Sequence, residues 1–174
     1  MGNVVLGLLF LAPCTLYSLK KQFEGGISLF YSASLGSIGT ALAVLTERGH
    51  VVVSESVENG RSKKTFSVTE RGRSAFLAWM REPITQRDFE TIALSRLFFL
   101  GLLPKPDRSE VLARIHERQQ ADEAALRELA LQLDAMEVPA EHREVFRYQR
   151  QVLEYGLLSY RAVGDFFREV DSTA

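Results

Sequence analysis

The chain has 174 residues, of which 46% are apolar and 25% charged, and its formal net charge is −1. This is the composition of an ordinary globular protein of one compact domain or two small ones, and the single cysteine excludes a disulfide framework and agrees with a reducing compartment. The charge is uneven, because residues 1–83 carry nine Lys and Arg against six Asp and Glu, whereas residues 84–174 carry twelve against sixteen.

The N-terminal region begins with an apolar run from Val4 to Ala12. No Lys or Arg precedes it and it is too short to span a bilayer, so we expect a buried helix over about Val4–Leu11, in a cytoplasmic protein without membrane contact. Pro13 interrupts this helix. Thr15 or Ser18 can cap a second helix that runs through Phe23 and ends at Gly25-Gly26.

The most informative segment runs from Leu35 to Arg71. A third helix, with Ser34 as N-cap and Gly49 as its left-handed end, leads into a hairpin of Val51–Val57 and Lys64–Val68, with Asn59 and Gly60 in the turn. Thr69 can cap a fourth helix from Glu70 to about Met80, and Pro83 closes the unit. The order predicts a winged helix-turn-helix DNA-binding domain over residues 1–83 of a mainly α chain.

In the third helix, Leu35, Ile38, Leu42 and Leu45 have the spacing of a core face, which leaves small polar residues for the major groove. The basic hairpin tip can contact phosphates or simply keep the tip soluble, and a lysine pair is common on any helix surface. The candidate DNA-binding residues are Tyr17, Lys20, Lys21, Ser34, Ser37, Gly39, Thr40, Arg61, Lys63 and Lys64.

Residues 84–174 form a second predicted domain, all α-helical, with helices over about Arg87–Leu103, Ser109–Met136 and Glu141–Val170. The last two carry narrow apolar seams with coiled-coil spacing, which pack most simply as an antiparallel hairpin. A seam that so small a unit cannot cover alone predicts a second copy of the chain, and the candidate dimerisation residues are Val145, Tyr148, Val152, Tyr155, Ala162 and Phe166.

Successive motifs occur in order over the first 80 or so residues: Leu6-Gly-Leu-Leu, Leu16-Tyr17-Ser-Leu-Lys20-Lys21, Leu29-Phe30-Tyr31-Ser32, Gly36-Ser37-Ile38, Ala41-Leu42, Leu45-x-x-x-Gly49 and Thr69-Glu-x-Gly72-Arg73. They resemble the motifs of PadR-family transcriptional regulators. The helical second half is similar to the C-terminal dimerisation domain of the larger subgroup, and Ser95-Arg-Leu-Phe-Phe99 resembles the start of that domain. The resemblance implies a homodimer that binds a palindromic operator, usually as a repressor. A small-molecule effector, if present, would act by changing the angle between the DNA-binding domains through the C-terminal helices.

The third helix departs from the family pattern, since Gly39-Thr40 stands where members carry Tyr-Pro and Ala43-Val44 where they often carry Lys-Arg. The alternative interpretation is therefore a winged-helix protein-interaction or scaffolding module that has lost DNA binding. Catalytic and metal sites are not expected, because the three histidines are far apart and Gln120 stands where a zinc-protease helix starting at His116-Glu117 needs its second histidine. We expect no cofactor and no enzymatic activity.

Overall fold

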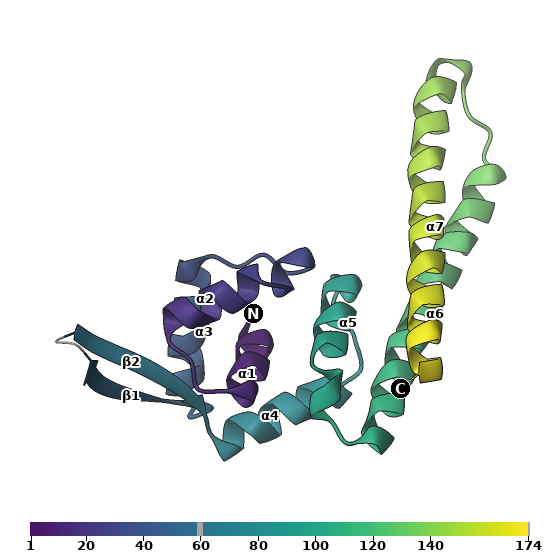
Figure 1. Cartoon of the computed structure of the whole chain (residues 1–174). Helices are drawn as coiled ribbons and strands as arrows, with labels where there is room; N and C mark the ends of the chain where they lie inside the picture. The colour runs from purple at the N-terminus through teal and green to yellow at the C-terminus, as the bar shows by residue number, and fades with distance from the viewer. Residues whose placement is uncertain (59–60, 174) are drawn as a thin grey trace. The chain divides into compact units, whose positions relative to one another are not determined.

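The computed structural model describes residues 1–58 and 61–173, without the side chains of residues 58, 61 and 173. The described chain is mainly helical with one two-stranded hairpin, which confirms the predicted fold class (Figure 1). None of its helices is long and apolar enough to cross a membrane. The elements are α1 (Gly2–Leu11), α2 (Leu16–Glu24), η1 (Ile27–Leu29), α3 (Leu35–Glu47), β1 (Val51–Glu58), β2 (Arg61–Val68), α4 (Glu70–Arg81), α5 (Phe89–Phe98), η2 (Leu100–Leu102), α6 (Lys105–Asp134), η3 (Ala140–His142) and α7 (Arg143–Thr173).

The backbone contacts divide the chain into two compact units, and the division is not a single point in the sequence. One unit contains residues 1–83 and 90–103, and the other contains residues 84–89 and 104–174. Most of α5, placed in the second domain by the sequence analysis, therefore packs with the N-terminal unit. The contact between Gly7 and Phe99, the residue that follows α5, explains this. The Phe99 ring packs so closely on α1 that a β-carbon on Gly7 would lie only 2.7 Å from it.

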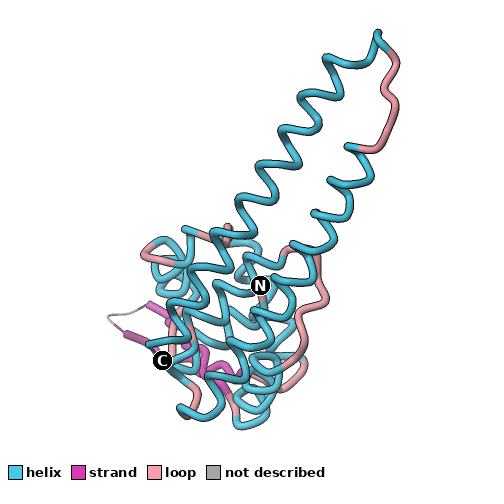
Figure 2. The backbone as a smooth tube through the Cα atoms, turned by 90° about the vertical axis from the view of Figure 1, so that its right-hand side faces the viewer, coloured by secondary structure: helices cyan, strands magenta, loops and turns pink. Residues whose placement is uncertain are grey.

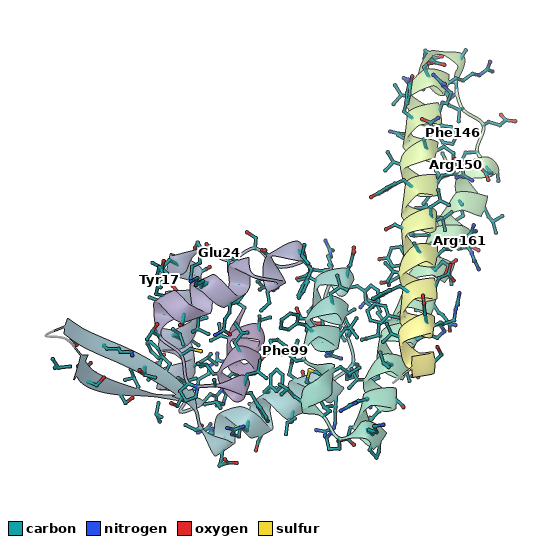
Figure 3. The ribbon with its side chains drawn as sticks, in the orientation of Figure 1. Tyr17, Glu24, Phe99, Phe146, Arg150 and Arg161 are labelled. Carbon is teal, nitrogen blue, oxygen red and sulfur yellow. The ribbon has the colours of Figure 1, made fainter. Side chains whose placement is uncertain are left out.

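Helix α1 forms the centre of the N-terminal unit, as the apolar run predicts. It is buried along its whole middle and contacts α2, α3, α4 and β2, as a helix that is apolar on all sides must. Figure 3 shows Phe99 beside it. The side chains that complete this core are Leu19, Phe23, Ile27, Ile38, Leu42, Leu45, Val51, Phe76, Met80 and Phe99.

The helix ends confirm the predicted caps. Thr15, Ser34 and Thr69 each accept a hydrogen bond from the backbone N–H three residues later, and Ser34 and Ser37 form a reciprocal capping box. Gly49 has φ +70°, the left-handed conformation predicted for the end of α3.

The hairpin pairs β1 with β2 in antiparallel register from Val51 opposite Val68 to Glu58 opposite Arg61, so both strands are longer than the sequence predicts. Figure 2 shows the strands in magenta. The predicted turn residues Asn59 and Gly60 lie outside the described residues. The base of the hairpin is attached to the α1–α2 connection, because Cys14 and Phe66 exchange two backbone hydrogen bonds of 3.0 and 2.8 Å.

The second unit is built on α6 and α7, which pack side by side as an antiparallel hairpin (Figures 1 and 2). On α6, the predicted seam residues Leu112, Ile115 and Gln119 are buried, but further along Ala130 is buried and Leu129 is 43% exposed. A straight helix drifts relative to a strict heptad repeat, which accounts for this change of face.

On α7, the prediction that one seam serves the intramolecular hairpin is wrong. The residues that turn toward α6 include Leu153, Gly164 and Phe167, all buried, whereas the predicted seam lies on another side of the helix. A β-carbon on Gly164 would stand 2.8 Å from the Gln119 amide, so this glycine lets the two helices approach. Every predicted dimerisation residue, from Val145 to Phe166, is therefore exposed in the single chain.

A charged pair connects α6 and α7 near their joined ends. Arg150 Nε and Nη2 donate to the two carboxylate oxygens of Asp134, at 2.8 and 3.1 Å. The hydrogen bond from Arg150 lowers the pKa of Asp134 below its usual value of 3.8. The folded chain therefore favours the ionised form of Asp134, which adds to the free energy of unfolding. This stabilisation is present above the unfolded-state pKa and is lost as the pH falls through the lower folded-state pKa.

We expect the helical signal of the second unit to weaken below about pH 4, because protonation of Asp134 removes the charged partner that joins Arg150 to α6. Circular dichroism during acid titration measures this change. Asp134→Asn should remove the part of the pH dependence that belongs to the pair, whereas Glu137→Gln, a matched loss of an exposed carboxylate, should keep it. Identical titrations of wild type and Asp134→Asn would show that the pair does not stabilise the hairpin.

Candidate nucleic-acid interface

A groove of about 400 Å³ lies in the N-terminal unit, where the first turns of α2 and α3 meet strand β2. It brings together three of the predicted DNA-binding residues, Tyr17, Lys63 and Lys64, from segments far apart in the sequence. Figure 3 labels Tyr17 in α2. The complete lining is Thr15, Leu16, Tyr17, Leu35, Ser62, Lys63, Lys64 and Phe66.

Two helix N-termini open at this groove. Neither α2 nor α3 has an acidic residue in its first turn. The partial positive charge of each helix end is therefore not neutralised by its own sequence, which favours an anionic group outside. The local reason for both helices to begin here is the capping described above, by Thr15 in α2 and Ser34 in α3.

Strand β2 supplies the cations of the groove. Lys63 and Lys64 are both exposed, and Lys64 Nζ lies 2.9 Å from Glu55 Oε1 on the paired strand. Both side chains of that pair are more than half exposed, so water screens it and the ammonium can exchange the carboxylate for a phosphate at little cost. Arg61 begins the same strand, but its side chain lies outside the described residues.

The two lysines of α2, both predicted to contact DNA, have different surroundings. Lys20 Nζ donates to the carbonyl of Ala33 at 3.1 Å and lies 3.0 Å from Glu24 Oε1, so it ties α2 to the connection before α3. Lys21 is exposed. Neither lysine lines the groove, and Lys20 is held as a structural group.

The polar side chains at the start of α3 bond mainly to their own helix. Ser37 Oγ donates to the Ser34 carbonyl at 2.9 Å, and Thr40 Oγ1 donates to the Gly36 carbonyl at 3.0 Å. The surface beside them is open, since a β-carbon on Gly39 would meet nothing within 4 Å. Ser34, Ser37, Gly39 and Thr40 thus lie together at the start of one helix, but the hydroxyls of Ser37 and Thr40 donate to backbone carbonyls, and Ser34 Oγ donates to Ser37 Oγ.

The apolar lining of the groove is not apparent from the sequence. Leu35 was assigned to the core by its spacing, but it is 47% exposed, whereas Ile38, Leu42 and Leu45 are buried. Its position at the first residue of α3 is the signal that could have identified it, because the first turn of a recognition helix extends beyond the core it packs on. Phe66, half-buried on β2, carried no comparable signal.

Other features of the described residues do not resemble an active site. They contain no cluster of three or more His, Cys, Asp or Glu that could hold a metal ion. A second cavity of about 320 Å³ lies in the other unit, where the connection between α6 and α7 folds against the start of α7. It is lined mostly by apolar side chains, among them Val138, Val145 and Phe146, with His142 and Glu137.

Comparison with known proteins agrees with this arrangement. Residues 5–78, which include α2, α3 and β2 of the groove, match the model of the transcriptional regulator PadR-like family. Residues 92–173 match the model of the C-terminal region of virulence activator alpha. Residues 5–78 therefore form a PadR-like domain, and PadR-like transcriptional regulators are not enzymes.

The chain is similar to individual PadR-like proteins at low identity. It is 22% identical over 120 residues to the negative transcriptional regulator PadR of Bacillus subtilis and 27% identical over 70 residues to a "probable transcriptional regulator" of Mycobacterium tuberculosis. These matches cover 67% and 40% of this chain, and 65% and 37% of the two relatives. The crystal structure of Bacillus subtilis PadR in complex with operator DNA aligns with 99% of this chain and 97% of that chain, at 18% identity and a TM-score of 0.45.

Proposed function

We propose that this PadR-like chain is a homodimeric, sequence-specific DNA-binding regulator that represses transcription by binding a palindromic operator. Helix α3 would enter the major groove and strand β2 would contact the flanking phosphates. The observation that carries the proposal is the groove in which two uncompensated helix N-termini meet Lys63 and Lys64. Since duplex DNA is the partner, we place the protein in the cytoplasm.

A second copy of the chain is part of this proposal. Helix α7 exposes a continuous series of large apolar side chains, and an apolar surface of this kind marks an interaction site. A homodimer has two-fold symmetry, so it presents two recognition helices to the two halves of a palindrome, about 34 Å apart for adjacent half-sites. The exposed apolar residues of α7 are Val145, Tyr148, Val152, Tyr155, Leu158 and Phe166.

The test is a titration of the purified protein against its own upstream DNA and a scrambled duplex, by fluorescence anisotropy at several salt concentrations. A DNA-binding regulator should prefer the upstream duplex and lose affinity steeply with salt, because each phosphate contact releases counterions. Binding that is absent even at low salt would favour the alternative interpretation, a winged-helix protein-interaction or scaffolding module.

Replacing Lys63 or Lys64 with alanine should weaken binding to every duplex by a similar factor. In a dimer each substitution removes two phosphate contacts, so we expect the slope of log K against log salt to become shallower by about 2. Lys105→Ala is the matched control, since it removes an exposed lysine of α6, outside the unit that holds the groove. Unchanged salt slopes in both groove variants would show that β2 does not contact phosphates.

A further inference from the structure

The start of α3 has few hydrogen-bond donors left for reading bases. The Ser37 hydroxyl donates to the Ser34 carbonyl, and in the same capping box Ser37 Oγ accepts from the Ser34 backbone N–H at 2.9 Å. The Thr40 hydroxyl donates to the Gly36 carbonyl. A hydroxyl has a single hydrogen, so these groups can offer a base only acceptor positions unless the helix start is rearranged.

The groove next to these hydroxyls is apolar in the middle and basic along one side. Leu35 and Tyr17 line it with 47% and 75% of their surface exposed, and Leu16 and Phe66 complete the apolar part. The ammonium-bearing residues Lys63 and Lys64 line the side formed by β2. A partner that fits has an apolar group next to an anion.

We infer that this groove reads thymine, by contact of Leu35 and Tyr17 with the 5-methyl group while Lys63 and Lys64 hold a phosphate of the same strand. The inference rests on the proposed function and names the base that the site selects. Among the groups that a duplex displays in the major groove, the thymine methyl is the apolar one, and apolar side chains recognise it by contact. The phosphates lie beside it on the same strand and supply the anion.

The experiment begins with duplexes selected by the protein from a random pool. Each thymine of the selected site is then replaced by deoxyuridine, which removes the methyl group and keeps every hydrogen-bonding position of the base. We expect Kd to rise about fourfold for each contacted thymine, the fold-change that corresponds to burial of one methyl-sized group. Thymines outside the two symmetric contact positions should show no change.

Leu35→Ala connects the effect to the groove. In this variant, the difference between the thymine and deoxyuridine duplexes should fall well below fourfold, because one of the two side chains that touch the methyl group is gone. Val44→Ala is the matched control: it truncates another exposed apolar residue of α3 that does not line the groove, and it should keep the fourfold difference. Leu35→Met, which keeps apolar contact, should keep part of the difference and shows that substitution at this position leaves the domain folded.

A rescue experiment gives a second readout. With a C·G pair at the contacted position, 5-methylcytosine should bind about fourfold more tightly than cytosine, since it restores the methyl group alone. If no duplex binds at any salt concentration, the proposed function itself fails. Salt-dependent binding that is unaffected by loss of the methyl group at every thymine would leave the proposed function intact and overturn the thymine readout.

Discussion

Replacing Gly72 with alanine is expected to lower the free energy of unfolding of the N-terminal unit by about 3 kcal/mol, the upper end of the usual cost of overpacking. A β-carbon at this position would lie 2.1 Å from the carbonyl oxygen of His50 and 2.9 Å from Val68 Cγ2. The oxygen belongs to the backbone and already accepts the N–H of Thr69 at 3.0 Å, so it cannot move without loss.

The effect should extend beyond Gly72 because α4 begins at a junction of three elements. Thr69 Oγ1 accepts the Gly72 N–H and donates to the carbonyl of Gly49, at the end of α3. Displacement of the first turn of α4 therefore disturbs the end of α3 and the base of the hairpin together. We expect operator affinity to fall with stability.

Urea unfolding followed by tryptophan fluorescence measures the free energy of unfolding of the N-terminal unit. The signal comes from this unit because Trp79 is the single tryptophan of the chain and lies in α4. Gly101→Ala is the matched control, since a β-carbon there would meet nothing within 4 Å, and it should change the free energy of unfolding by less than about 0.5 kcal/mol. Equal stabilities of the two variants would contradict the packing seen around Gly72.

The second large effect is expected on α7, where Val152→Glu should convert the proposed dimer into monomers. Val152 is 71% exposed in the single chain, so the change leaves the folding of the α6–α7 hairpin almost untouched. A symmetric interface would bury the new charge twice, at about 3 kcal/mol each, which raises the dimer dissociation constant by about four orders of magnitude.

Loss of the dimer should also weaken operator binding by at least about a hundredfold. The two DNA-binding domains are then no longer joined, so binding at one half-site no longer raises the local concentration of a domain at the other. Sedimentation velocity gives the oligomeric state, and anisotropy with full and half operators gives the coupling. Gln120→Glu, on the exposed surface of α6, adds the same charge away from α7 and should remain dimeric. A dimer that persists in Val152→Glu would exclude this face as the interface.

Local structure was largely predictable from particular residues. Thr15, Ser34 and Thr69 cap helices because a short hydroxyl side chain satisfies a backbone N–H within the same turn, whatever lies elsewhere in the fold. The core face of α3 was predicted from Ile38, Leu42 and Leu45 by spacing alone. The same spacing wrongly included Leu35, because periodicity identifies a face and cannot tell where the core ends along the helix.

The candidate site was less predictable, since its groove depends on contacts between distant segments. The basic residues of the hairpin and the small residues of α3 could be selected by type. That Lys63 and Lys64 share a groove with Tyr17, however, depends on the pairing of Cys14 with the base of β2. That Lys20 bonds to the Ala33 carbonyl also depends on tertiary packing, which decides whether a basic side chain is free for a ligand.

The sequence by itself determined which segments become helices and strands, which residues cap the helices, and that residues 5–78 form a PadR-like domain. These depend on short-range hydrogen bonds, on periodicity and on a linear order of motifs. The tertiary structure alone decided which face of α7 packs on α6, because the helix has two apolar sides and Leu153 and Phe167, not Tyr155 and Phe166, fit the surface that α6 offers. It also decided that α5 packs with the N-terminal unit, where Phe99 fills the space left by Gly7. Whether a side chain is buried depends on the residues that pack against it, and these contacts exist only in the folded chain.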